Sequence, residues 1–196
     1  MTAPTPAATV PTPGTVYVIF SAEVNPTTAE ALIAVMAKCV ADGVREVYLA
    51  LSSPGGTVMN GLNLYNVLRA MPFALTTHNV GNVDSIGNAI FLAGLRRFAA
   101  PHSTFMFHGV GFETPSGLRF DEKTVRERLD SILADQKRIG AIIQERTQLT
   151  AEQVEALFRE AQTKDAAYAA STGIVDEVRD LQIPAGAPIV SLVFQR

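Results

Sequence analysis

The feature that most limits how this chain can fold is its repeated alternation of short strand-like runs with helical segments. Runs rich in Val, Ile, Leu, Phe and Tyr are typical of buried strands, and amphipathic spacing between them is typical of helices. Strands are predicted at 16–20, 47–51, 74–77 and 104–107, and helices at 25–42, 59–70 and 85–95. Because parallel strands need a crossover between them, this order predicts an α/β fold with a largely parallel sheet and helices on both faces.

The second half of the chain is organised around one long charged helix, predicted over 121–147. Its apolar stripe is narrow, so we expect this helix to project from the body and to pack against another subunit. A flexible loop is expected before it at 109–117, and the helices and edge strand predicted after it are 150–160, 166–171 and 189–194. We expect a single domain over 15–196, preceded by a flexible lead over 1–14.

Composition excludes several classes of partner. The chain has 196 residues, of which 47% are hydrophobic, which is enough for one core. Its net charge is −3 and its Lys and Arg residues are scattered, so neither nucleic acid nor a membrane surface is predicted as a partner. The apolar stretch at 89–95 is too short to cross a bilayer, and the lead does not resemble a secretion signal. The single cysteine, Cys39, cannot form an internal disulfide, which favours a reducing, cytoplasmic location.

Two reactive side chains follow neighbouring predicted strands. Ser85 comes after the third strand and His108 ends the fourth, so one edge of the sheet could present both. Histidine titrates near neutral pH and is the usual base that activates a serine hydroxyl. The amide of Ile86, at a predicted helix start, could bind an oxyanion, and Gly56 in a Pro-Gly-Gly turn could offer a second amide. This combination indicates a serine hydrolase.

Each motif also has a plain structural interpretation. A Pro-Gly-Gly sequence is often only a turn, a serine before a helix is often its N-cap, and a histidine after a strand is often a core residue. The ordered trio is the more specific signal. His78 and His102 are predicted to be structural or exposed, because neither has metal-ligand spacing, and no metal or cofactor is predicted. Val83 stands where a Gly-x-Ser-x-Gly elbow has its first glycine, which disfavours an α/β-hydrolase.

From about Val16 to Val178, these segments resemble the proteolytic subunit of the Clp (caseinolytic) protease, within the ClpP/crotonase superfamily. Residues 53–56 match the family's Ser-Pro-Gly-Gly, and residues 81–94 follow its Gly-x-Ala-Ala-Ser-Met-Gly segment and apolar continuation without a gap. Residues 101–108 resemble its Pro-Asn-Ser-x-x-Met-Ile-His.

The resemblance implies that Ser85 is the nucleophile, His108 the general base, and the amides of Gly56 and Ile86 the oxyanion hole. It implies repeated ββα/βα units with a projecting handle helix in a handle region of about 109–148. It also implies cleavage of unfolded proteins or short peptides through an acyl-enzyme, in stacked rings fed by an ATP-dependent unfoldase. The expected partners are therefore a ring-like homo-oligomer, a polypeptide substrate and an unfoldase.

The chain departs from the family pattern in several places. Ala161 aligns with the catalytic aspartate, so the base lacks its usual orienting group, for which Glu160 or Asp165 is a possible substitute. Asp84 stands beside the nucleophile where the family has alanine, and it could hinder deprotonation of the serine or cap a helix. Residues 109–110 replace the family's Gln-Pro, and the N-terminal lead does not resemble its axial loops, which weakens the expectation of an unfoldase partner.

The leading interpretation is a ClpP-like serine endopeptidase, and two alternatives stay open. The first is a catalytically impaired ClpP-like assembly or regulatory subunit, which keeps the fold but has lost a complete catalytic triad. The second is a crotonase-type acyl-CoA enzyme, which shares the paired-amide site but places acidic residues at the reacting carbon. Labelling by a serine probe separates the first alternative from a peptidase, and tight coenzyme A binding would favour the second.

Overall fold

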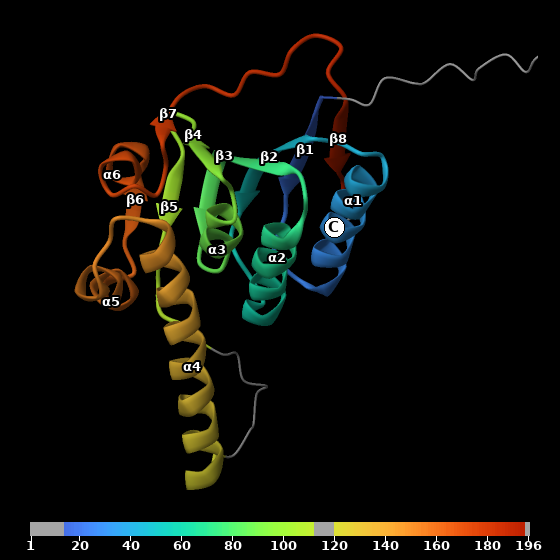
Figure 1. The fold of residues 1–196 in the computed structure, drawn as a ribbon. Helices are drawn as coiled ribbons and strands as arrows, with labels where there is room; N and C mark the ends of the chain where they lie inside the picture. The colour runs from blue at the N-terminus through green and yellow to red at the C-terminus, as the bar shows by residue number, and fades with distance from the viewer. Residues whose placement is uncertain (1–13, 112–119, 195–196) are drawn as a thin grey trace, which may run out of the picture.

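The computed structural model describes residues 14–111 and 120–194, which form an α/β structure around one sheet (Figure 1). The strand order is β6-β5-β3-β2-β1-β8, with β4 pairing with both β3 and β7. Every pairing is parallel except that between β5 and β6. The strands are β1 (Thr15–Ser21), β2 (Glu46–Ser53), β3 (Ala74–Asp84), β4 (Arg96–Ala99), β5 (Thr104–Met106), β6 (Thr163–Asp165), β7 (Glu177–Val178) and β8 (Ile189–Leu192).

Helices connect most of these strands, and α1, α2 and α3 lie side by side on one face of the sheet (Figure 1). The first helix starts as the sequence predicts, because the Asn25 side chain accepts from the Thr28 amide and Pro26 opens the first turn. The helices are α1 (Pro26–Ala41), α2 (Val58–Ala70), α3 (Gly87–Leu92), α4 (Glu122–Arg146), α5 (Ala151–Glu160) and α6 (Ala166–Ser171).

The predicted strands and helices are present, but β3 is longer than its apolar run. It continues beyond Thr77 to Asp84, because its first half pairs with β4 and its second half pairs with β5. That second pairing places Asp84 opposite Met106 in parallel register. The residues that follow the two strands, Ser85 and His108, therefore emerge at the same edge of the sheet.

The expectation that helices cover both faces of the sheet is wrong at β1. Val16, Val18 and Phe20 are buried on the helical face, whereas the intervening Tyr17 is only partly buried. Tyr17 and Tyr48 stack on the opposite face with ring centroids 5.1 Å apart, and they line an open groove with the segment around Arg179. Alternation of buried and half-exposed positions is typical of strands covered on one side only.

Helix α4 projects well beyond the body of the protein (Figure 1). Its first buried residue is Ile139, and most residues of the preceding turns are exposed. Val125, Leu129 and Leu133 recur every four residues there, and each is about half exposed. The loop predicted at 109–117 lies partly outside the described residues. Within the described part of the chain, no helix is both long enough and apolar enough to span a membrane.

The edge strand predicted near the C-terminus is β8, which pairs in parallel with β1. Phe194, just after it, packs edge-on against the buried ring of Phe20 at a centroid distance of 6.1 Å. Cys39 is buried on α1 among apolar neighbours, and burial raises the pKa of its thiol. Its position on the apolar face of a helix agrees with the prediction.

Candidate active site

Ser85 is held in a strained backbone conformation at the end of β3. Its φ is 55°, a left-handed value that few residues other than glycine adopt, and its amide donates to the Met106 carbonyl at 2.8 Å. Gly55 lies so close that a Cβ there would fall 2.7 Å from the Ser85 Cβ. Strained residues persist only where their surroundings fix them, and such positions cluster at functional sites.

His108 follows β5, and one of its ring nitrogens already has a defined partner. Its Nδ1 lies 2.7 Å from the carbonyl oxygen of Gly109. A carbonyl oxygen can only accept a hydrogen bond, so Nδ1 carries the proton in the neutral ring. The other nitrogen, Nε2, is therefore the one with a free lone pair, which is the form that a general base requires.

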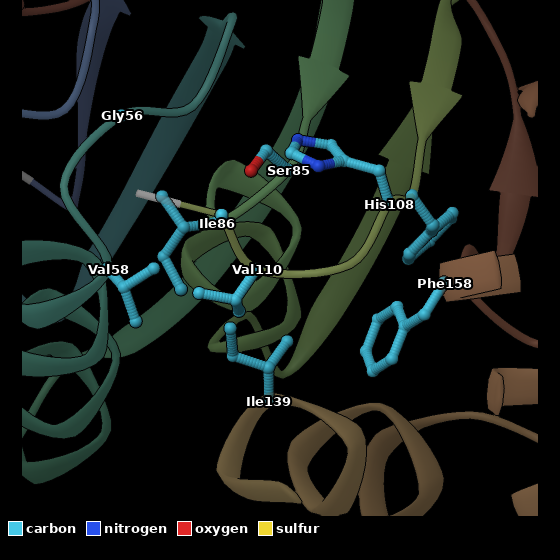
Figure 2. A pocket seen from close by; sticks show the side chains of 10 residues that line it. Gly56, Val58, Ser85, Ile86, His108, Val110, Ile139 and Phe158 are labelled. Atoms are coloured by element: carbon cyan, nitrogen blue, oxygen red, sulfur yellow. The ribbon is translucent and has the colours of Figure 1, made fainter. Parts of the chain in front are cut away.

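The two side chains share a small pocket of about 90 Å³, shown in Figure 2. In that view the His108 ring lies beside Ser85, with the serine oxygen turned away from the ring. No hydrogen bond joins Ser85 Oγ to His108 within the described residues, so rotation about χ1 of the serine must precede proton transfer. The remaining lining residues are Gly56, Val58, Ile86, Phe107, Val110, Gly111, Ile139 and Phe158.

Gly56 and Ile86 line the same pocket. An isolated parallel β-bridge joins Val24 to Gly56. The Val24 amide donates to the Gly55 carbonyl, and the Thr57 amide donates to the Val24 carbonyl, each at 2.7 Å. Neither hydrogen bond of this bridge uses the Gly56 amide. Ile86 is the N-cap of α3, where backbone amides have no acceptor inside the helix. With six residues, α3 is shorter than the predicted helix.

Gly56 cannot be replaced without a clash. Its φ is 140°, and a Cβ on it would lie 2.2 Å from the Val24 carbonyl oxygen. The absence of a side chain therefore lets two backbone segments meet at the pocket wall.

The residues considered as a third catalytic group lie elsewhere. Ala161 is the C-cap of α5, with a left-handed φ of 50°, and it does not line the pocket. Asp165 caps α6 by accepting from the Tyr168 amide at 2.8 Å. Glu160 is exposed at the end of α5, and it is not among the pocket residues either. The structure therefore does not bring Glu160 or Asp165 to His108.

Within the described residues, the Asp84 side chain caps no helix and makes no hydrogen bond to the serine hydroxyl. Its Oδ2 accepts from the Asn82 side chain at 2.6 Å, and Asn82 in turn accepts from the Ser52 hydroxyl. The carboxylate thus belongs to a short polar chain across β2 and β3.

His78 and His102 stand apart from this pocket. His78 is buried between Tyr48 Oη and the Arg179 carbonyl, at 2.7 and 3.0 Å, and burial lowers its pKa. His102 is exposed. Both agree with the prediction. Among the described residues, no group of His, Cys, Asp or Glu is placed to hold a metal ion.

Two positioning residues were missed by the sequence analysis. Asn88 on α3 is buried, and its side-chain amide donates to the carbonyls of Ser85 and Met106 at 3.0 and 2.9 Å. Gly61 on α2 leaves room for Ile86, since a Cβ there would lie 2.2 Å from Ile86 Cγ1. The only sequence signal was their type, a polar residue in an apolar helix and a glycine inside a helix.

We expect Asn88→Ala to weaken the link between Ser85 and β5. Two hydrogen bonds are lost, each with a net value of about 0.5–1.5 kcal/mol, so the free energy of unfolding falls by about 1–3 kcal/mol. Urea denaturation measures this change. Asn66→Ala, at an exposed position on α2, is the control and should change stability by less than about 0.5 kcal/mol. Equal effects of the two substitutions would contradict the role of Asn88.

Comparison with known proteins gives one consistent result. A family model described as Clp protease matches residues 14–182. The ATP-dependent Clp protease proteolytic subunit 1 of Leifsonia xyli subsp. xyli is 28% identical over 141 residues, covering 71% of this chain and 70% of that protein. The structure of a ClpP1 mutant from Listeria monocytogenes shares the fold, with a TM-score of 0.75 at 22% identity over 85% of this chain and 92% of that one. Because the family model spans most of its length, this chain belongs to the Clp protease family.

Proposed function

We propose that this protein is a serine endopeptidase that hydrolyses peptide bonds of unfolded proteins or short peptides through an acyl-enzyme. The observation that carries the proposal is the meeting of Ser85, His108, Gly56 and Ile86 in one pocket of a Clp protease fold. The named relative is itself a proteolytic subunit, which supports the same chemistry here.

The proposed reaction follows from the placement of these groups. After rotation of its side chain, Ser85 Oγ attacks the substrate carbonyl carbon and its proton passes to His108 Nε2. The amides of Gly56 and Ile86 bind the oxygen that becomes negative. The tetrahedral intermediate collapses, His108 returns the proton to the leaving amine, and a water molecule activated by the same ring then hydrolyses the ester.

We further propose that the chain self-associates into a ring-like homo-oligomer through its handle region, about 109–148. The exposed stripe of Val125, Leu129 and Leu133 on α4 supports this, because a projecting helix with apolar residues on one side is typical of a subunit interface. An ATP-dependent unfoldase as partner and a cytoplasmic location are the remaining parts of the proposal, and Cys39, free and buried, fits a reducing compartment.

A fluorophosphonate probe tests the proposal directly, because it reacts only with a serine that its surroundings have activated. We expect the intact mass of the purified protein to rise by one probe adduct and that of Ser85→Ala to stay unchanged. Native mass spectrometry of the same samples reports their assembly. Labelling that persists in Ser85→Ala, or an assembled oligomer that takes up no probe and cleaves no model peptide, contradicts the proposal.

The alternative of an impaired subunit is favoured by one specific observation, which is that alanine occupies position 161 and that no carboxylate among the described residues lines the pocket. Ala161→Asp separates the two functions, because Asp tolerates the left-handed backbone at this position. If the enzyme is impaired, Ala161→Asp should raise the rate of peptide cleavage by at least about 10-fold. Loss of the orienting carboxylate in a serine protease costs about 10⁴-fold in kcat, so a gain of this size is within reach. Ala161→Asn is the matched control with the same shape and no charge.

A further inference from the structure

The hydrogen bond from His108 to Gly109 belongs to a peptide unit that other parts of the chain hold in place. The carbonyl of Gly109 and the amide of Val110 are the two ends of one planar peptide group. That Val110 amide donates to Gln136 Oε1 of α4 at 3.1 Å, while the carbonyl accepts from His108 Nδ1 at 2.7 Å. Gln136 therefore fixes the plane in which the carbonyl faces the histidine.

A second contact anchors the same segment from α5. The Gly109 amide donates to the Phe158 carbonyl at 2.9 Å. A Cβ on Gly109 would lie 2.8 Å from Gln136 Oε1, so the absence of a side chain lets Gln136 keep its position. The two helices thus clamp the residue after His108 on both sides.

Hydrogen bonds in series strengthen one another. Donation by the Val110 amide to Gln136 polarises the peptide group and makes the Gly109 oxygen a better acceptor. This oxygen does for His108 one task of a triad carboxylate, since it holds the proton on Nδ1 and leaves Nε2 free. It carries no full charge, so it stabilises the imidazolium less than a carboxylate would.

We infer that the Gly109 carbonyl orients His108 in place of the missing carboxylate, and that Gln136 is the positioning residue that holds this carbonyl. The inference rests on the proposed function for its meaning in catalysis, but the orientation of the ring can be measured without any activity. Glu160 and Asp165 then need no role at the base.

The tautomer of His108 is the direct measurement. Solid-state ¹⁵N NMR on protein with labelled histidine distinguishes Nδ1–H from Nε2–H rings, and His108→Gln identifies the signal. We expect Nδ1–H for His108. His78 is an internal contrast, because its Nε2 donates to the Arg179 carbonyl and it should therefore show Nε2–H.

Gln136→Leu removes the acceptor, and Gln136→Glu keeps an oxygen at that place. We expect Gln136→Leu to shift His108 toward a mixture of tautomers and to lower kcat by about 10-fold or more, with KM little changed. The loss should stay smaller than the roughly 10⁴-fold loss in kcat that a fully wrong tautomer causes. Gln136→Glu should restore both the tautomer and kcat. His78 signals that stay in place show that both variants are folded.

The outcomes separate this inference from the proposed function. A parent His108 in the Nε2–H form, or a Gln136→Leu protein with unchanged tautomer and kcat, overturns the inference whatever the probe labelling shows. A Nδ1–H ring that depends on Gln136, in an assembled protein whose Ser85 takes up no probe and which cleaves no model peptide, supports the orientation and overturns the peptidase function instead.

Discussion

Ser85→Ala and His108→Ala are each expected to lower kcat for peptide cleavage by about 10⁴-fold or more, and the double variant is expected to be no slower than either. The serine oxygen supplies the new bond and the histidine takes its proton, so the two groups act as one unit. Steady-state hydrolysis of a fluorogenic peptide measures the three rates.

The matched control is His102→Ala, which removes an exposed histidine outside the pocket and should leave kcat unchanged. Additive losses in the double variant would mean that the two side chains contribute separately, and a peptide-cleaving Ser85→Ala protein would place the nucleophile elsewhere.

The second large effect is expected for Gly56→Ala. Alanine keeps the backbone N–H, but moving this donor away from the oxyanion should cost as much as removing it, which lowers kcat by about 10²–10³-fold. Here the added Cβ also lies 2.2 Å from the Val24 carbonyl oxygen, in a backbone conformation that alanine does not tolerate. We therefore expect both a loss of activity of at least this size and a lower melting temperature, measured by peptide hydrolysis and thermal unfolding.

Gly14→Ala is the control, because no atom of the described residues lies within 4 Å of a Cβ at that position. It should leave the rate and the melting temperature as they are. A Gly56→Ala protein that keeps the parent rate would show that its amide does not bind the oxyanion.

The periodic apolar segments could be predicted from the sequence because their positions depend on local patterns. Both the start and the end of helices α1, α2, α4 and α5 lie within about two residues of their predicted limits. The strands β4, β6 and β7 gave no such signal. β4 is the sequence Arg-Arg-Phe-Ala and β6 is Thr-Lys-Asp, and each becomes a strand only because β3 or β5 offers it a free edge.

At the site, sequence order predicted that Ser85 and His108 would meet, and the parallel register of β3 and β5 is the physical reason. Gln136 and Asn88 could not be predicted in this way. The Gln136 hydrogen bond crosses 26 residues, and one of the two hydrogen bonds of Asn88 crosses 18 residues, so nothing local indicates these two partners. Such contacts are consequences of how α3 and α4 pack, so they become visible only in three dimensions.

The strand β8 has a consequence for the order in which the protein is made. Among the described strands, β1 leaves the ribosome before the others, whereas β8, which covers its outer edge, leaves after them. Until the C-terminal segment emerges, the nascent chain exposes the long edge of β1, and an unpaired edge can recruit a strand from another chain. Contacts between distant segments also form slowly. Synthesis of this protein therefore includes a late closing step, during which a neighbouring nascent chain on the same messenger could compete for β1.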